Sequence, residues 1–204
     1  MSLAALRDAA RACKGCDLYL RGTQTVFGEG TKGARIMFVG EQPGDKEDVD
    51  GKPFVGPAGK LLDRALEEAG IERADTYVTN AVKHFKWEPR GKRRIHAKPN
   101  GMEIAACRPW FNAELAVVNP EIVVCLGASA AQMLIGKSFK VTQRRGELVD
   151  GKALKPAIAA TVVATVHPSS ILRAQDEESR HLEYELFVRD LKIVAEHLHG
   201  RRAA

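Results

Sequence analysis

The sequence predicts an α/β fold, in which a mostly parallel sheet is covered by helices on both faces. Short apolar runs typical of buried strands alternate along the chain with longer segments of helical periodicity. Such alternation is characteristic of parallel strands joined by crossover helices. No internal repeat, low-complexity tract or Pro- or Ser-rich linker divides the 204 residues, so we expect a single domain over residues 1–204.

The N-terminal half contains two of the predicted strands. The apolar run at residues 35–39 ends before Gly and Pro, which makes it too short for a helix. A helix opens at Pro57, a residue that is tolerated in a first turn. The elements expected here are, in order, a helix over residues 2–12, a strand near 35–39, a helix from Pro57 to about Leu66, a strand over 76–80 and a long basic loop that runs to about Pro99.

The C-terminal half continues the alternation. The apolar run at 121–126 passes through Gly127 into a short helix. In the last helix, Leu182, Leu186, Val194 and Leu198 recur at the spacing of a core-facing surface. The elements expected here are a helix over 101–118, a strand over 121–126, a helix over 128–135, a strand over 161–166 and a helix over 177–199.

The composition is that of a globular protein, with 45% hydrophobic and 28% charged residues. The first residues begin an amphipathic helix and lack the basic and apolar regions of a signal peptide. No window approaches the length of a membrane span. We therefore expect a cytoplasmic protein with no membrane partner, and because nothing indicates an obligate oligomer, we expect a monomer.

The net charge of +5 is modest, but its placement is informative. Phe85 and Trp87 interleave with a crowd of basic residues, and a second basic pair is Arg144-Arg145. Clustered cations beside aromatic rings favour a nucleic-acid partner, because the rings can stack on bases. The alternative is a solvated loop. The basic residues of this segment are Lys83, His84, Lys86, Arg90, Lys92, Arg93, Arg94, His96 and Lys98.

The chain has four cysteines, of which Cys13 and Cys16 form a C-x-x-C pair. Disulfides are rare in the cytosol, so metal ligation is the preferred interpretation. Four thiolates suit an iron–sulfur cluster or a structural zinc, and the spacing does not choose between them. Cys107 lies in a predicted helix. Cys125 ends a predicted buried strand, where a cysteine that simply belongs to the core is the alternative.

Polar residues follow three of the predicted strands. The segment Glu41-Gln42-Pro43-Gly44-Asp45 follows the first, Asn80 ends the second, and His167-Pro168-Ser169 follows the strand at 161–166. Parallel strands bring such ends to one edge of the sheet, where ligands bind. An Asn amide matches the edge of a nucleobase, and Phe54 can stack on its ring. Each residue also has an ordinary structural explanation, as a cap, core ring or buried imidazole. Their joint placement beside the basic segment favours a nucleobase site.

These motifs resemble the uracil-DNA glycosylase superfamily over nearly the whole chain, closest to its iron–sulfur, family-four-like branch. The insertion Gly91-Lys92-Arg93-Arg94-Ile95-His96 resembles the signature loop of the UdgX group. The family-four pattern has Ala where this chain has Gln42 and lacks the basic loop, and both departures favour the UdgX group. The other similar segments are Gly40-Glu41-Gln42-Pro43-Gly44-Asp45, Pro53-Phe54-Val55-Gly56-Pro57-Ala58-Gly59, Thr79-Asn80-Ala81-Val82-Lys83 and His167-Pro168-Ser169.

The resemblance implies a three-layer α/β/α sandwich and a structural [4Fe–4S] cluster on Cys13, Cys16, Cys107 and Cys125. The implied partner is uracil-containing DNA, including single-stranded DNA, from which uracil is excised. His167 would stabilise the departing uracil anion, Glu41 and Asp45 the cationic sugar, and His96 would become covalently joined to deoxyribose C1′. The residues expected to bind the base are Gln42, Phe54, Asn80 and Lys83. Those expected to bind DNA are Lys92, Arg93, Arg94, Ser169, Ser170 and Arg173.

Elementary chemistry agrees with this assignment. A glycosidic bond breaks most easily through an oxocarbenium-like sugar, which the anionic Glu41 favours. A neutral imidazole of His96 held near C1′ competes with water at a very large effective concentration. Two other functions stay open. One is a multiple-turnover glycosylase that releases free abasic DNA, with His96 only binding DNA. The other is a non-catalytic binder of uracil-containing DNA, in which the metal supports folding.

Overall fold

The computed structural model describes residues 2–200; residue 1 and residues 201–204 of the single domain predicted over 1–204 lie outside the described residues. Six strands form the central sheet in the order β1-β3-β2-β6-β8-β7. The inner four strands run parallel, and the edge strands β1 and β7 are antiparallel to their neighbours. The strands are β1 (Glu29–Gly30), β2 (Ile36–Gly40), β3 (Thr76–Asn80), β6 (Ile122–Leu126), β7 (Val149–Asp150) and β8 (Thr161–Thr165).

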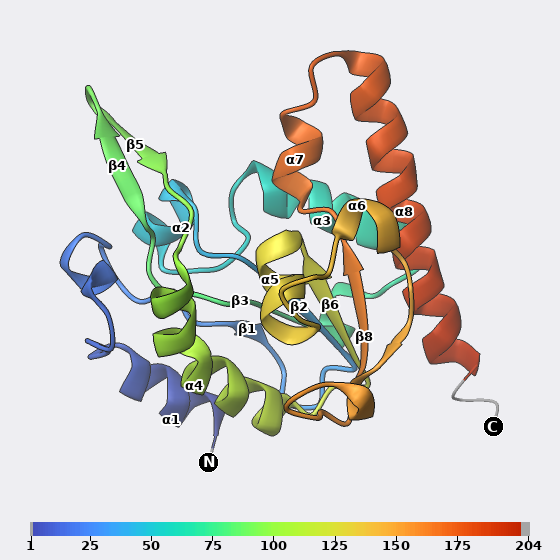
Figure 1. The fold of residues 1–204 in the computed structure, drawn as a ribbon, viewed down its shortest axis with the longest axis horizontal. Coiled ribbons are helices and arrows are strands. Elements are labelled where there is room, and N and C mark those ends of the chain that lie inside the picture. Colours follow the sequence, from blue (N-terminus) through green and yellow to red (C-terminus); the bar gives the residue numbers. More distant parts are fainter. Residues whose placement is uncertain (1, 201–204) are drawn as a thin grey trace.

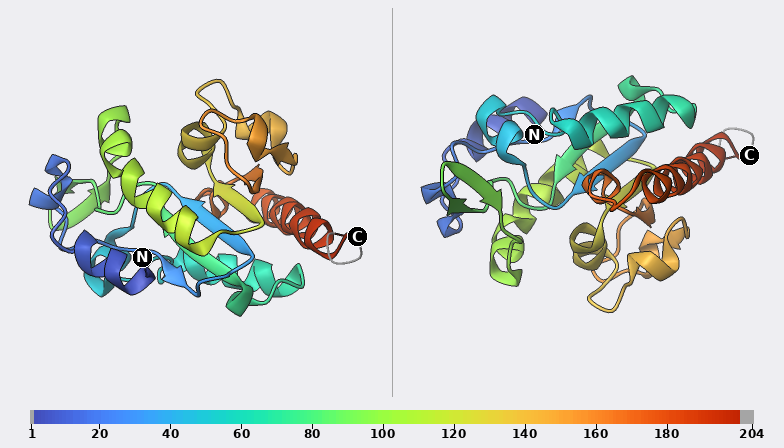
Figure 2. Two further views of the ribbon diagram at one scale, coloured as in Figure 1. Left: turned by 90° about the horizontal axis from the view of Figure 1, so that it is seen from below. Right: turned by 90° about the horizontal axis from the view of Figure 1, so that it is seen from above.

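Helices cover both faces of the sheet (Figures 1 and 2). Along β2, Ile36 and Phe38 point to the face covered by α3 and α8, whereas Met37 and Val39 point to the face covered by α4 and α5. The predicted α/β class, a mostly parallel sheet between two helical layers, is therefore confirmed. The helices are α1 (Leu3–Ala10), α2 (Asp45–Asp50), α3 (Pro57–Glu68), α4 (Gly101–Val118), α5 (Ala128–Leu134), α6 (Val141–Arg144), α7 (Pro168–Leu172) and α8 (Glu177–Gly200).

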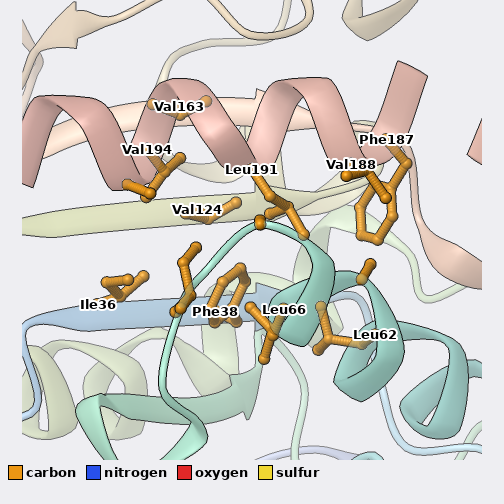
Figure 3. Packing of buried hydrophobic residues seen from close by; sticks show 14 of the residues in the cluster. Ile36, Phe38, Leu62, Leu66, Val124, Val163, Phe187, Val188, Leu191 and Val194 are labelled. Carbon is orange, nitrogen blue, oxygen red and sulfur yellow. The ribbon is translucent and has the colours of Figure 1, made fainter. Parts of the chain in front are cut away.

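The first core layer joins α3 and α8 over the sheet (Figure 3). Leu62 and Leu66 of α3 and Leu191 of α8 are each at most 1% exposed. Leu182, predicted on the core-facing surface of the last helix, is instead 55% exposed. That prediction was wrong because the first turns of α8 extend beyond the sheet, so its buried side begins only at Tyr184 (Figure 1). In the part of the chain that the structure describes, no helix is long and apolar enough to cross a membrane.

The basic segment predicted as a loop contains a two-stranded hairpin that projects from the body of the protein (Figure 1). Its strands are β4 (Trp87–Arg90) and β5 (Arg93–His96), which pair in an antiparallel manner. Gly91 at the turn has a φ of 60°, a conformation that glycine adopts readily in two-residue hairpin turns. The hairpin places His96 at its base rather than on a free loop.

Candidate active site

The carboxyl ends of the parallel strands form one edge of the sheet, where several predicted site residues meet. Gly40 at the end of β2 lies directly opposite Asn80 at the end of β3. Glu41 follows β2, and His167 follows β8. The backbone N–H of Gly127, which follows β6, donates to the last carbonyl of β8 at 2.8 Å. The structure thus brings the predicted strand ends together.

Asn80 and Phe54 lie together beside Gly40. Asn80 is 3% exposed, and a Cβ atom at position 40 would collide with its Oδ1 and with the ring of Phe54, so glycine is required there. Phe54 has a φ of 56°, a strained left-handed conformation for a bulky residue. The ring centroids of Phe54 and His167 are 6.0 Å apart, with planes inclined by 27°. An amide, a phenyl face and an imidazole are therefore neighbours at this edge.

The turn after β8 holds His167 in one tautomer. Nδ1 of His167 accepts a hydrogen bond from the backbone N–H of Ser169 at 3.1 Å, so this nitrogen carries no proton. Burial, together with smaller electrostatic effects of the neighbouring Arg173 and His96, lowers the pKa of His167 to about 4. The imidazole is therefore neutral near pH 7, with its proton on Nε2, where it can be donated to a ligand.

This lowered pKa makes stability fall in acid. A histidine in the unfolded chain titrates near pH ~6.5, so between that pH and 4 the unfolded chain binds more protons than the folded one. We expect the share of the unfolding free energy due to His167 to fall by about 1 to 2 kcal/mol from pH 7 to 5. Urea unfolding of the wild type and His167→Asn at both pH values measures it, since Asn can still cap α7. An equal pH dependence in the two proteins would contradict this expectation.

Glu41 and His96 face each other. The distance from His96 Nε2 to Glu41 Oε1 is 3.3 Å, and the two side chains are 49% and 21% exposed. Gln42, predicted to bind substrate, turns its amide toward the hairpin instead. Its Nε2 donates to the carbonyls of Lys86 and Ala97 at 3.0 and 3.1 Å, and its Oε1 accepts the Lys86 N–H at 3.0 Å. Gln42 thus clamps the base of the hairpin that carries His96.

Arg94 fixes the hairpin to α2. Its guanidinium lies 2.6 Å from Asp45 Oδ1 and 2.6 Å from Oδ2 of the fully buried Asp48. It also lies 5.5 Å from the ring centroid of Phe85 and 5.7 Å from that of Trp87. These contacts commit Arg94 to the protein rather than to the predicted phosphate contact. They also balance the charge of Asp45, which was predicted to stabilise a cationic sugar, so Asp45 anchors the hairpin.

Lys83, predicted to bind substrate, points into the interior. Its Nζ lies 2.6 Å from Glu114 Oε2 and donates to Thr79 Oγ1 at 2.6 Å and to the Asn80 carbonyl at 2.7 Å. Both charged side chains are 0% exposed. Glu114 also accepts a hydrogen bond from the Tyr77 hydroxyl at 2.9 Å. The pair therefore supports the end of β3 from behind and does not reach a ligand at the edge.

Replacing Glu114 with glutamine is expected to lower the free energy of unfolding by about 3 to 5 kcal/mol, because it leaves the Lys83 ammonium buried without a counter-charge. The matched control is Glu147→Gln, which breaks an exposed pair with Arg144 and should cost less than about 1 kcal/mol. Urea unfolding of both variants makes the comparison. Similar small losses in the two would mean that the buried pair contributes no more than a surface pair.

The remaining residues predicted to bind DNA fall into two groups. Lys92 and Arg93 are exposed at the turn of the hairpin. The hydroxyls of Ser169 and Ser170 instead contact His167, at 2.8 Å from Nδ1 and 2.7 Å from the carbonyl oxygen respectively. Arg173 lies at the C-terminal end of α7, close enough to influence His167 electrostatically. The accessible basic residues among them are therefore Lys92 and Arg93 at the hairpin tip and Arg173 at the end of α7.

Three of the four cysteines lie near one another. Cys13 Sγ accepts a hydrogen bond from Trp110 Nε1 at 3.1 Å, three residues beyond Cys107 on α4. Cys16 packs against Cys107 in a small buried cluster. Burial raises the pKa of the Cys107 thiol to about 11, and the Cys13 and Cys16 thiols are close enough to add to that rise.

Cys125 stands apart from this group. It lies within β6 between β2 and β8, and its pKa is raised by burial alone. Over residues 2–200, no three His, Cys, Asp or Glu side chains lie close enough together to hold a metal ion. The structure thus gathers Cys13, Cys16 and Cys107 loosely and does not bring Cys125 to them, so the predicted four-cysteine set does not fit.

Two polar contacts at this edge were not predicted from the sequence. Ser129 at the start of α5 donates its hydroxyl to Glu41 Oε2. Glu47 of α2 accepts the backbone N–H of Gly56 at 3.0 Å and so fixes the loop after Phe54. The run Gly127-Ala128-Ser129 after an apolar strand is a signal that locates Ser129 at this edge. Nothing in the sequence pairs Glu47 with Gly56.

The fold and its polar edge define an α/β protein with a candidate ligand site at the ends of its parallel strands. A family model described as the uracil DNA glycosylase superfamily matches residues 27–192, and the chain belongs to this superfamily. It is similar to the type-4 uracil-DNA glycosylase of Thermotoga maritima, with 39% identity over 179 residues that cover 87% of each chain. The type-4 enzyme of Sulfurisphaera tokodaii is 37% identical over 176 residues, 84% of this chain and 76% of the relative. That of Archaeoglobus fulgidus is 35% identical over 169 residues, 79% and 78% of the two chains.

Proposed function

We propose that this protein excises uracil from DNA and then captures the deoxyribose covalently through His96, as the resemblance to the UdgX group implies. Relatives with 35% to 39% identity are named type-4 uracil-DNA glycosylases, which supports the excision. The position of His96 carries the proposal of capture. Its imidazole lies 3.3 Å from Glu41, at the edge that also holds Asn80, Phe54 and His167.

The chemistry divides between two steps. The bond between uracil N1 and C1′ breaks, and its electron pair leaves with uracil. The Nε2–H of the neutral His167 stabilises the uracil anion, while the carboxylate of Glu41 stabilises the cationic sugar. The unprotonated nitrogen of His96 then donates its lone pair to C1′. Glu41 balances the positive charge on the imidazole and accepts its proton, which passes finally to the uracil anion.

A denaturing gel tests this proposal. The protein is incubated with single-stranded DNA that carries one uracil, and with the same strand carrying thymine as the control. A uracil-dependent band retarded by the mass of the protein supports excision with capture. Free abasic strands, revealed by alkaline cleavage, would instead assign a turnover enzyme. Intact DNA that the protein still binds would assign a non-catalytic binder.

We further propose that a [4Fe–4S] cluster, on binding, draws together the thiols of Cys13, Cys16 and Cys107, which do not form a preformed metal site in the described residues, with His84 in place of Cys125 as the fourth ligand. His84 is 4% exposed and follows Lys83, whose backbone N–H donates to Cys107 Sγ at 3.4 Å. Imidazole replaces thiolate in some iron–sulfur centres. A cluster here would join the loop after α1 to α4 and so stabilise the fold.

The cluster proposal predicts different effects of two cysteine replacements. Cys107→Ala is expected to lose bound iron and labile sulfide, whereas Cys125→Ala is expected to retain them, because Cys125 is remote from the other thiols. Iron and sulfide analysis of the purified proteins measures this directly. If Cys125→Ala lost iron while His84→Ala retained it, the four cysteines would be the cluster ligands and the proposal for His84 would be wrong. Stoichiometric zinc without iron would exclude a cluster.

A further inference from the structure

Ser129 and His96 contact opposite oxygens of the same carboxylate. The Ser129 hydroxyl donates to Oε2 of Glu41, and Nε2 of His96 lies 3.3 Å from Oε1. Glu41 therefore lies between a buried hydroxyl and the side chain proposed to capture the sugar. Nothing in the resemblance or in the relatives assigns a role to Ser129.

The fold explains how Ser129 reaches Glu41. β6 pairs with β2 in parallel, so the residues that follow β6 emerge beside the residue that follows β2. Gly127 makes the turn with a φ of 88°, and a Cβ there would lie only 3.2 Å from the Cβ of His167. The turn thus delivers Ser129 to this edge, where it is 6% exposed. Its hydroxyl is presented by the first turn of a helix that packs into the core.

The two residues that contact Glu41 differ in burial. Ser129 is buried on α5, whereas the His96 side chain is 49% exposed at the base of the hairpin. A carboxylate whose Oε2 is held by a hydroxyl cannot turn without breaking that bond, so Oε1 keeps a fixed direction toward the imidazole. The direction of the carboxylate toward the exposed imidazole is therefore set by the buried hydroxyl.

We propose that Ser129 is a positioning residue that aims Glu41 at His96 and so decides whether the sugar is captured by imidazole or by water. This inference rests on the proposed function. Once the bond to uracil has broken, the sugar cation reacts with whichever nucleophile is correctly placed, and small displacements change such rates steeply. A carboxylate without Ser129 still stabilises the cation by its charge, but it no longer fixes the imidazole.

Three variants at position 129 test the proposal under single-turnover conditions with uracil-containing single-stranded DNA. Ser129→Thr keeps the hydroxyl. Ser129→Val has nearly the same shape as the threonine variant but lacks the hydroxyl, and Ser129→Ala removes the hydroxyl with the least steric change. We expect the rate of adduct formation to fall about tenfold or more in the Ala and Val variants, the size expected for a lost hydrogen bond to a charged group. Abasic strands should appear in their place, and Thr should restore capture relative to Val.

The outcomes separate this inference from the proposed function. The inference is wrong, and the proposed function stands, if the wild type forms adduct and the Thr and Val variants give the same ratio of adduct to abasic strands as the wild type. A fall in total uracil excision with an unchanged ratio of adduct to abasic strands would give Ser129 a purely structural role and also overturn the inference. If the wild type forms no adduct, both fail. Thermal unfolding of each variant shows whether it is folded.

Discussion

Replacing His96 with alanine is expected to abolish the denaturation-resistant protein–DNA complex while uracil release continues. The imidazole is the proposed capturing group, whereas cleavage of the bond depends on Asn80, His167 and Glu41. Groups held in position reach effective concentrations of about 10⁵ M or more, so adduct formation should drop by about 10³-fold or more when only water competes for C1′. A denaturing gel under single-turnover conditions measures adduct and released uracil in the same reaction.

The His96→Ser variant extends this expectation. A small polar side chain leaves room for water beside C1′, so the variant should leave abasic strands and release the DNA. Lys98→Ala is the matched control, because Lys98 lies two residues away on the same exposed segment and should leave capture intact. If the deoxyribose were instead attached to Lys98, in a bond that became stable only on reduction, the adduct would be a Schiff base and the mechanism would be wrong.

The strands and their polar ends were the features that the sequence predicted best. The parallel strands β2 and β6 are continuous apolar runs, and β3 and β8 are short segments rich in β-branched residues. The backbone geometry of parallel strands brings Glu41, Asn80 and His167 to one edge. The hairpin that carries His96 was harder to predict, because its exposed strands have no buried face and therefore no clear alternation. Gly91 at its turn was the available signal.

The roles of charged residues could not be predicted from local sequence. Lys83 and Arg94 belong to the same basic segment, yet their partners Glu114 and Asp48 lie 31 and 46 residues away. A pattern of cations indicates a basic surface but does not show which cations are neutralised by remote carboxylates. In the same way, the presence of four cysteines does not show which of them lie together in space, because the sequence does not reveal that Cys125 lies within the sheet, away from the other three.

The difference between neutralised and exposed cations predicts a large effect of an arginine replacement on covalent capture. Arg94→Gln is expected to lower the rate of covalent capture about 100-fold at saturating DNA, the size expected when a reacting group is displaced by about 1 Å. Loss of the guanidinium removes the contacts with Asp45 and Asp48 that hold the hairpin to α2, two residues before His96. Adduct yield against time on denaturing gels gives the rate.

Arg93→Gln is the matched control, because Arg93 is the adjacent residue of β5 and is exposed. It should leave the capture rate at saturation unchanged and reduce the salt dependence of DNA binding, by a slope of about 0.7 per lost phosphate contact on a single strand. The two neighbouring arginines would then act on different quantities, one on the position of the imidazole and the other on affinity. If Arg94→Gln instead alters only affinity and its salt slope, as Arg93→Gln should, then Arg94 leaves its carboxylates to bind phosphate when DNA is present.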